Sequence, residues 1–372
     1  MGRHRPTVRR LGGLKTTYVI PTAFPRVPAR HLIMISNVTS LVSLSLGTEA
    51  ATRLSQLVAT PTLPTGKLGH PTRAEIAHAL NLVLFAGILD RVPTGKAYTE
   101  DVAAAGGKVH FDHGALRTVR WQENGALPAG EAAFTRILRP LGYRLNGTYP
   151  LDRIGMTGRS YAHADAPEEI AQFFLSEFHP ERYSEEFQQA VSHVVGNSVD
   201  PLTPRAQSLL WELERDGALP LADAGELIDL LAGCFERQHA TPHLNDYERL
   251  LAESSEMAWI ATEGNAFNHA TDRVEDVFAV SDEQKHVGRP MKEKVEVSQS
   301  GRVKQTAFRA DPVRRAFVGA SGDEVVREVP GSFYEFITRD RYVDEAQAIT
   351  RTDLGFDAGN AQGIFKMTAA AC

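Results

Sequence analysis

Three ionisable residues lie among bulky apolar residues in three separate segments of the 372-residue sequence: His113, His269 and Glu335. Each segment alternates apolar and polar residues with the period of a β-strand. A buried carboxylate without a partner would be neutralised, so Glu335 requires a cation or a hydrogen-bonding group. A divalent metal shared with two imidazoles meets this requirement. Two histidines and one carboxylate also make up the facial triad, which binds Fe(II) and leaves positions open for substrate and O2.

The alternation predicts which side chains accompany each candidate ligand, because successive side chains of a strand point to opposite faces. The expected same-face neighbours are Val109 and Phe111 for His113, Phe267 and Thr271 for His269, and Phe333 and Ile337 for Glu335. His110 and Asp112 then lie on the opposite face as supporting or surface groups, unless a rotated register exchanges them with the ligand. Since the three segments are distant in sequence, structural burial with an Arg–Glu pair is the alternative to a metal site.

Five segments carry a resemblance to a known family: HFDHGALRT at 110–118, GNAFNHATDRV at 264–274, residues 288–310, VPGSFYEFITR at 329–339 and FDAGNAQGIFKM at 356–367. Together they resemble the 2-oxoadipate dioxygenase/decarboxylase family, over roughly residues 75–370. The resemblance implies a fold distantly similar to the vicinal-oxygen-chelate enzymes. It also implies that non-haem Fe(II) is held by the same three groups, His113, His269 and Glu335, and that Arg117 binds a substrate carboxylate.

For the activity, the resemblance implies an enzyme that converts 2-oxoadipate and O2 to 2-hydroxyglutarate and CO2 in lysine catabolism. The substrate supplies its own 2-oxo acid, so no separate 2-oxoglutarate is required. Better-characterised members carry extra sequence before the last motif, where this chain has only about twenty residues. Asn360 stands at the place of a small hydroxyl residue beside the substrate. We therefore expect Arg117 to be catalytic and substrate-binding and Asn360 to be substrate-binding, while the chain length of the substrate stays open.

Two other classes of protein use the same features. A vicinal-oxygen-chelate lyase or isomerase would hold Zn(II) or Ni(II) with the same ligands and would not use O2. A non-catalytic protein would use the fold for binding or scaffolding, and Asn360 together with the short C-terminal region leaves this class open. Metal analysis combined with O2 uptake separates these alternatives.

Other histidines and basic residues are weaker candidates. His239 and His243 are four residues apart, as in a metal-binding pair on a helix, but Pro242 between them breaks a helix. His163 is expected to be an ordinary packing residue. A dicarboxylate substrate requires a second cationic or hydrogen-bonding anchor. The basic residues of the expected hairpin at 295–310 are candidates for it: Arg302, Lys304 and Arg309.

The composition restricts the class of partner. A net charge of −6 gives no reason to expect a nucleic-acid partner. Cys234 and Cys372, the two cysteines, exclude a disulfide framework and a thiolate metal site and fit a reducing, cytoplasmic compartment. Residues 31–46 are too short and too polar to span a bilayer. The expected partners are therefore a small 2-oxo acid and O2, with no membrane, and the oligomeric state stays open.

The pattern along the chain predicts an α+β fold, in which a vicinal-oxygen-chelate-like pair of β-rich modules forms a metal-holding sheet. Residues 1–60 are expected to be a basic, poorly ordered extension that catalysis does not need, since the first 48 residues contain no Asp or Glu. Residues 70–370 are the expected catalytic domain, with a helical insertion at about 180–257. Thr72 and Glu75 have the spacing of a capping box, which predicts a helix from Thr72 to Leu89.

Overall fold

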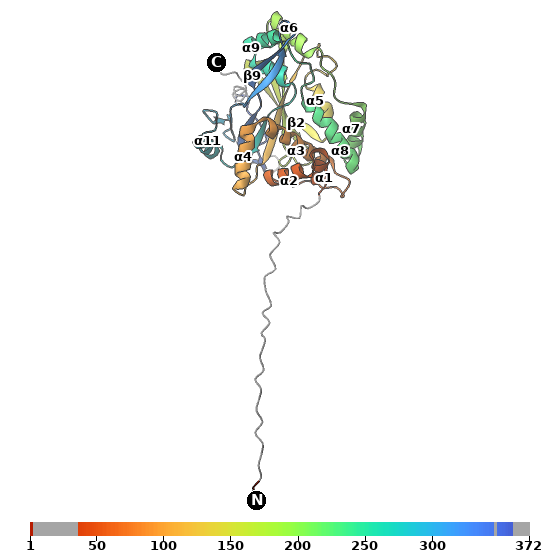
Figure 1. The fold of residues 1–372 in the computed structure, drawn as a ribbon, viewed down its shortest axis with the longest axis vertical. Coiled ribbons are helices and arrows are strands. Elements are labelled where there is room, and N and C mark those ends of the chain that lie inside the picture. The colour runs from red at the N-terminus through yellow and green to blue at the C-terminus, as the bar shows by residue number, and fades with distance from the viewer. Residues whose placement is uncertain (3–35, 346–347, 360–372) are drawn as a thin grey trace. The chain divides into compact units, whose positions relative to one another are not determined.

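The computed structural model describes residues 1–2, 36–345 and 348–359. The contacts within the chain divide it after residue 34, and the described helices and strands belong to the second unit, residues 35–372. A mixed eight-stranded sheet forms the centre of this second unit (Figure 1). Its strands, in spatial order, are β2 (Tyr143–Leu151), β3 (Met156–His163), β4 (Gln172–Phe178), β1 (Phe111–Val119), β5 (Phe267–Arg273), β10 (Phe333–Arg339), β7 (Val303–Ala307) and β6 (Glu296–Val297).

Two β-rich modules contribute half of this sheet each. Strands β1 to β4, between residues 111 and 178, form one half, and strands β5, β6, β7 and β10, between residues 267 and 339, form the other. The halves meet where β1 runs antiparallel to β5. On the two sides of this seam, β1 pairs in parallel with β4, and β5 pairs in parallel with β10. The predicted α+β class with two β-rich modules in one sheet is therefore confirmed.

Helices connect the two modules. Between β4 and β5 the chain forms η2 (Pro180–Arg182), α6 (Glu185–Val195), α7 (Pro204–Asp216), α8 (Leu221–Ala232), η3 (Gly233–Phe235), α9 (Leu244–Glu253) and α10 (Ser255–Glu263). The helices extend beyond the expected block, about 180–257, to Glu263. The other elements after β1 are α5 (Ala132–Leu138), η1 (Asp152–Ile154), α11 (Val277–His286), the hairpin of β8 (Pro312–Val318) with β9 (Glu324–Pro330), and the hairpin of β11 (Arg341–Asp344) with β12 (Ile349–Thr352).

The sheet separates two apolar cores, because its strands bury side chains on both faces. One core joins sheet residues such as Leu116 and Tyr334 to the helices before β1 and to α5, α7 and α8. The other core joins sheet residues such as Ala115 and Phe174 to α6, α9, α10 and the β8–β9 hairpin. Leu116 and Ala115 are consecutive yet belong to different cores, as the alternation of a strand requires.

The expectation of a poorly ordered extension is wrong for residues 37–57. These residues form α1 (Asn37–Leu46) and α2 (Thr48–Leu57), and α1 packs against both α2 and α3 (Arg73–Arg91) (Figure 1). Leu41 and Leu54 are buried in the first core. The expectation was wrong because it rested on the basic composition of the first 48 residues and not on the apolar pattern of these two helices. Residues 3–35 of the expected extension lie outside the described residues.

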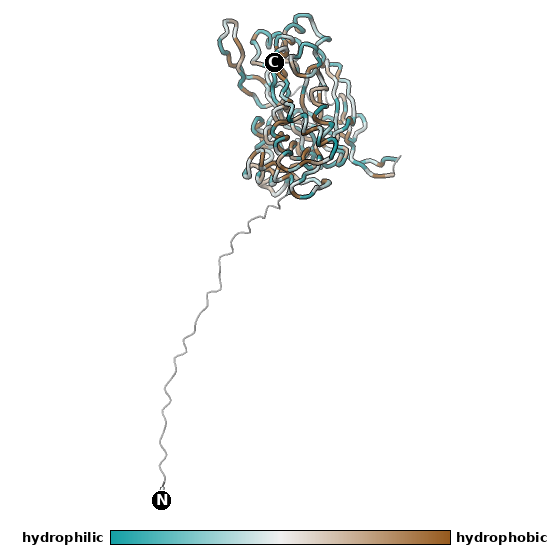
Figure 2. Tube along the Cα trace, turned by 90° about the vertical axis from the view of Figure 1, so that its right-hand side faces the viewer, coloured by the Kyte–Doolittle hydropathy of each residue, from teal (hydrophilic) through white to brown (hydrophobic). Residues whose placement is uncertain are grey.

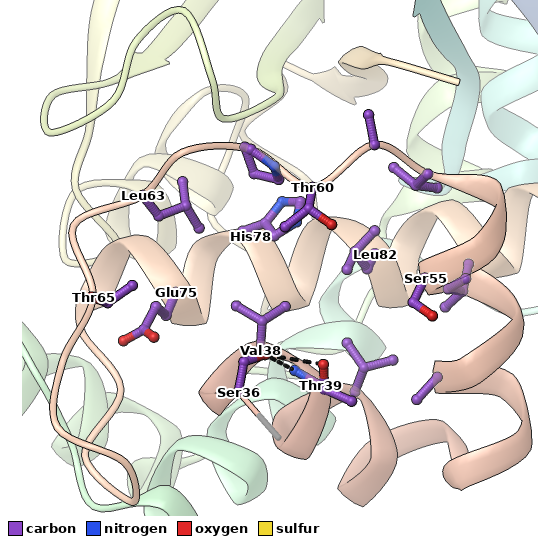
Figure 3. A pocket seen from close by; sticks show the side chains of 16 residues that line it. Ser36, Val38, Thr39, Ser55, Thr60, Leu63, Thr65, Glu75, His78 and Leu82 are labelled. Carbon is purple, nitrogen blue, oxygen red and sulfur yellow. Dashed lines mark hydrogen bonds between the residues drawn. The ribbon is translucent and has the colours of Figure 1, made fainter. Parts of the chain in front are cut away.

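Helices α1, α2 and α3, together with residues 58–65, also line a pocket of about 150 Å³. Its lining includes apolar side chains such as Val38 and Leu82 and hydroxyl groups such as that of Thr60 (Figure 3). His78 of α3 also lines this pocket and is buried, with 6% of its surface exposed. Burial lowers the pKa of His78 to about 4, so this imidazole is neutral at pH 7.

The predicted capping box at the start of α3 is confirmed. The Thr72 side chain accepts a hydrogen bond from the backbone N–H of Glu75, and the Glu75 carboxylate accepts one from the backbone N–H of Thr72.

None of the described helices alone is long and apolar enough to cross a membrane. Helix α3 and α4 (Pro93–Ala104) reach that length and apolarity only together, across a bend of 114°. Apolar and polar residues are interspersed along the trace (Figure 2).

Candidate metal centre

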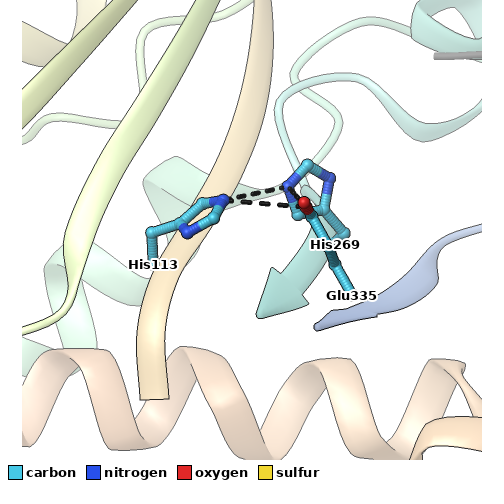
Figure 4. A group of neighbouring side chains, drawn as sticks. All are labelled: His113, His269 and Glu335. Atoms are coloured by element: carbon cyan, nitrogen blue, oxygen red, sulfur yellow. Dashed lines mark hydrogen bonds and ion pairs between the residues drawn. The ribbon is translucent and has the colours of Figure 1, made fainter. Parts of the chain in front are cut away.

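His113, His269 and Glu335 converge at the centre of the sheet. They come from the adjacent strands β1, β5 and β10, and one potential ligand atom from each lies within 4.8 Å of the other two (Figure 4). The strand register produces this meeting, since both His113 and Glu335 pair with Thr271, two residues after His269. All three side chains are at least 93% buried. The structure thus brings together the three residues selected from the sequence.

The spacing of the three ligand atoms fits a metal ion. Nε2 of His269 lies 2.9 Å from Oε2 of Glu335, and Nε2 of His113 lies 3.4 Å from the former atom and 3.7 Å from the latter. Two donors that bind a metal at about 2.1 Å with an angle of about 90° between them are about 3 Å apart. Oε1 of Glu335 is buried and accepts no hydrogen bond from the described residues. The three groups therefore suit one face of a coordination shell.

The protonation states suit a cation as well. Burial favours the protonated form of Glu335, but His269, His113 and the Thr271 hydroxyl together hold the pKa of this carboxyl below its usual value. Burial also lowers the pKa of His269, which favours the neutral imidazole that a metal binds. The Thr271 hydroxyl lies 3.1 Å both from Oε2 of Glu335 and from Nε2 of His113. An ionised carboxylate and a neutral imidazole are forms that bind a divalent metal.

Two β-bulges change the neighbours that simple alternation assigned, so two of the expected pairs are wrong. The β1–β5 register shifts between Phe111 and His113, and again opposite the step from His269 to Phe267. The Phe111 ring packs against Phe85 of α3, at 4.9 Å between centroids, in the first core. Phe267 also belongs to that core. Each bulge inserts one residue, and one inserted residue reverses the face of everything beyond it.

Gly114, which pairs with Ala270 beside the second bulge, leaves room for the Phe267 ring. A Cβ atom on Gly114 would lie 2.2 Å from Cε2 of Phe267, so the ring occupies the space of a side chain at that position. Gly114 follows His113 and therefore faces away from the metal cluster. Phe267 thus lies on the face of the sheet that packs against the first core, while His269 lies on the opposite face, with His113 and Glu335. The expected same-face neighbour Thr271 does lie with His269, and Phe333 contacts the His269 ring at 4.7 Å.

Asp112 supports His113 from the side. Its Oδ1 lies 2.8 Å from Nδ1 of His113 and can accept a hydrogen bond from it. This bond fixes the tautomer that leaves the Nε2 lone pair directed at the cluster. Burial raises the pKa of Asp112, but the charges of Arg339 and Arg273 outweigh it and hold this pKa well below the usual value. Of the two positions that the sequence allows for Asp112, supporting group or surface group, the structure shows the first, with the side chain fully buried.

Asn268 supports His269 in a similar way. Its side-chain amide lies 3.0 Å from Nδ1 of His269, and its Oδ1 has no hydrogen-bond partner among the described residues. Turning the amide by 180° exchanges Oδ1 and Nδ2 without any change of shape. In that orientation Oδ1 accepts a hydrogen bond from Nδ1–H, and Nε2 of His269 is free for a metal.

Arg117 lies four residues beyond His113 on β1, with its side chain completely buried. Its guanidinium lies over the Trp259 ring of α10, 4.6 Å from the centroid. Burial lowers the pKa of Arg117 to about 10, partly offset by the charge of Glu256, and the group remains cationic at pH 7. Its charge also lowers the pKa of His269. A buried cation beside a metal cluster is suited to an anionic ligand.

The remaining sequence candidates have structural partners or lie elsewhere. Nε2 of His163 lies 2.8 Å from the carbonyl of Leu141, and Nε2 of His239 lies 2.9 Å from that of Ala261, so both bond to backbone. Two of the three basic hairpin residues form ion pairs, Arg302 with Asp353 and Lys304 with Asp340. The third, Arg309, is exposed. Asn360 lies outside the described residues.

Comparison with known proteins decides the family. The family model described as 2-oxoadipate dioxygenase/decarboxylase matches residues 88–348. This chain belongs to the 2-oxoadipate dioxygenase/decarboxylase family. The match contains the three residues of the metal cluster, Asp112 and Arg117. A curated member, the chloroplastic 2-oxoadipate dioxygenase/decarboxylase of Arabidopsis thaliana, is 30% identical over 144 residues, which cover 34% of this chain and 38% of that relative.

Solved structures resemble the family fold seen in this chain. A crystal structure described as a glyoxalase superfamily protein from Ralstonia eutropha JMP134 is 72% identical, with a TM-score of 0.84 over 87% of this chain and 99% of that chain. The hydroxyglutarate synthase of Oryza sativa, solved in complex with 2-oxoadipate, is 20% identical, with a TM-score of 0.57 over 84% of this chain and 96% of that chain. At that identity the rice structure supports the fold alone.

Proposed function

We propose that this protein is a non-haem Fe(II) dioxygenase/decarboxylase that acts on a 2-oxo dicarboxylic acid, with 2-oxoadipate as the first candidate. The observation that carries the proposal is the buried His113–His269–Glu335 cluster in a chain of this family. Two imidazoles and one carboxylate with open positions are the ligand set of Fe(II) oxygenases. The similarity to the Arabidopsis 2-oxoadipate dioxygenase/decarboxylase supports 2-oxoadipate as the substrate.

The proposed reaction balances. 2-Oxoadipate and O2 give 2-hydroxyglutarate and CO2, so the bond between the carboxylate and the keto carbon breaks and both oxygen atoms of O2 enter the products. The bound Fe(II) would supply the redox chemistry that O2 requires. No other organic co-substrate is needed, because the 2-oxo acid that loses CO2 is the substrate itself. The product would belong to lysine catabolism.

The residues around the cluster would then bind and orient the substrate. Arg117 would pair with a substrate carboxylate, because it is a buried cation close enough to His269 to lower the pKa of that imidazole. Asp112 would keep Nε2 of His113 unprotonated for the metal. The Phe356 ring lies 4.8 Å from the His113 ring and would exclude water from that side. Asn360, four residues further, would contact the substrate.

Anaerobic loading with Fe(II), followed by addition of O2, tests this proposal. We expect O2 consumption equal to CO2 release with 2-oxoadipate, formation of 2-hydroxyglutarate, and slower turnover of 2-oxo acids one carbon shorter or longer. Glu335→Gln, which keeps the shape of the side chain but removes a charged ligand, should lose both iron and turnover. Arg309→Gln, an exposed change, is the control. Turnover without O2 would identify a lyase or isomerase, and binding of 2-oxoadipate without turnover would identify a binding protein.

A further inference from the structure

Residues 353–356, which we call the strap, cross the sheet on the side of the metal cluster. The carbonyl of Leu354 accepts hydrogen bonds from the side chains of Asn146 on β2 and Gln172 on β4, at 3.2 and 3.3 Å. The backbone N–H of Phe356 donates to the Tyr149 hydroxyl of β2 at 3.1 Å. These bonds hold the strap to the first β-rich module, although it follows the second in sequence.

The Phe356 side chain places the strap in contact with a candidate metal ligand. Its ring meets the His113 ring edge-on, at 4.8 Å between centroids and 88° between planes. The same ring lies 4.8 Å from Phe174 of β4, a member of the second core. The strap therefore closes over His113 with an aromatic side chain anchored in a core.

Arg339, at the end of β10, binds both the strap and the carboxylate that supports His113. Its Nε and Nη2 each lie 2.9 Å from an oxygen of Asp112. Its Nη1 donates to the carbonyls of Asp353 and Gly355 at 2.9 and 2.7 Å. The guanidinium also lies over the Phe356 ring at 4.7 Å from the centroid. The Arg339 side chain is 0% exposed, so these contacts are made without competition from water.

We propose that Arg339 is a positioning residue that couples docking of the strap to the orientation of His113, so that metal binding and strap docking stabilise each other. The physical basis is that one planar guanidinium donates both to the Asp112 carboxylate and to two carbonyls of the strap, in directions fixed relative to each other. If the strap leaves, Arg339 loses its two carbonyl acceptors, and its geometry at Asp112 is no longer fixed. Asp112 in turn holds the Nδ1 side of His113. The inference rests on the proposed metal site but not on the identity of the substrate.

Arg273 provides a matched control within the same network. Its Nε lies 2.6 Å from Oδ2 of Asp112, so it contributes the same kind of ion pair as Arg339. Its Nη1 donates to the carbonyl of Glu168, which lies outside the strap. Arg273→Lys and Arg339→Lys therefore both keep one positive charge beside Asp112, but only Arg339→Lys removes the fork that holds the strap carbonyls.

The first experiment measures hydrogen exchange of the strap amides with and without Co²⁺, used as the probe metal. In the wild-type protein and in Arg273→Lys, Co²⁺ should slow exchange of the Phe356 amide at least about fivefold, the lower end of ordinary coupling between sites. In Arg339→Lys, Co²⁺ should still bind but should leave that exchange rate unchanged. Equal protection of the strap in Arg339→Lys and the wild-type protein would overturn the proposal.

The second experiment uses the reciprocity of coupling and avoids the Asp112 network, so it holds even if Arg339→Lys fails to fold. Tyr149→Phe removes the acceptor of the Phe356 amide and should weaken Co²⁺ binding, measured by its visible absorption, several-fold. Tyr143→Phe, which removes a buried hydroxyl bonded to Asn81, is the control and should not change Co²⁺ affinity. Unchanged affinity in Tyr149→Phe would refute the coupling. Failure of the wild-type protein to bind Co²⁺ would instead refute the proposed metal site.

Discussion

Asp112 and His113 are consecutive residues of β1, yet their side chains meet, with Oδ1 of Asp112 2.8 Å from Nδ1 of His113. Consecutive side chains of a regular strand point to opposite faces. The register shift between Phe111 and His113 is what allows the contact. The bulge therefore changes the face to which His113 points and also brings the Asp112 carboxylate next to the His113 ring.

Asp112→Asn should weaken metal binding about 10- to 100-fold, because an amide supports the His113 tautomer less strongly than a carboxylate does. The variant also leaves Arg273 and Arg339 without a buried counter-charge, so the free energy of unfolding should fall by about 3–5 kcal/mol. Co²⁺ titration and urea unfolding measure the two effects. Asp340→Asn, which breaks the more exposed ion pair with Lys304, should change neither by much. Unchanged metal affinity in Asp112→Asn would show that Asp112 does not orient His113.

Gly114→Ala should destabilise the protein by about 1–3 kcal/mol or more, because its new methyl group would overlap the Phe267 ring that fills this space. Gly233→Ala is the matched control, since its φ is −64° and no atom lies within 4 Å of the new methyl group. That control should be neutral or slightly stabilising. Thermal unfolding of both variants provides the measurement. Equal melting temperatures would mean that Phe267 moves away without cost.

The meeting of His113, His269 and Glu335 could be predicted from the sequence because burial of an ionisable group leaves a local signal. Glu335 lies between Phe333 and Ile337, and this alternation does not depend on how the strand pairs with its neighbours. The neighbours of His113 and His269 could not be predicted, because each depends on a bulge that one extra residue creates. The sequence contains no separate signal for a bulge besides Gly114, whose role depends on a ring more than 150 residues away.

The contacts of Arg339 and Phe356 could not be predicted from the sequence for a related reason. Both residues lie in segments that resemble the family, but a charged residue at a strand end usually faces solvent. Their importance arises from contacts with Asp112 and His113, which are more than 200 residues away in sequence. Conversely, the helix α3 was predictable to its first residue, because a capping box is a contact between residues three apart.

Removal of residues 1–60 should prevent stable folding, contrary to what the composition of that segment suggests. The deletion takes away α1 and α2, whose Leu41 and Leu54 are buried against the first core. Leu41→Ala alone should cost about 2–5 kcal/mol of unfolding free energy. Leu68→Ala, at a position that is 67% exposed, should cost less than about 0.5 kcal/mol. A deletion variant that melts at the wild-type temperature would show that the two helices contribute no stability.

The protein should lose stability as the pH falls from 6.5 to 4. Burial lowers the pKa values of His78, His163 and His239 to about 4, whereas the unfolded chain binds these protons near pH 6.5. The stability that each contributes, up to about 3 kcal/mol, is present above pH 6.5 and is lost as the pH falls to 4. His78→Leu should reduce the slope of unfolding free energy against pH in this window, and the exposed His286→Leu should not. Identical slopes in the wild-type protein and His78→Leu would contradict the burial argument.

Arg117→Lys should raise the apparent KM for 2-oxoadipate about 10- to 100-fold, while the iron content stays at the wild-type level. Lysine keeps the positive charge but loses the planar fork that binds a carboxylate through two hydrogen bonds, a loss on the order of 1.5–3 kcal/mol. It also loses the stacking of the guanidinium on the Trp259 ring, so urea unfolding should accompany the kinetics. Arg120→Lys, the same substitution at the exposed residue after β1, is the control and should leave the KM unchanged. A wild-type KM would remove Arg117 from the substrate site, whereas loss of iron would mean that Arg117 holds the ligand strand in place.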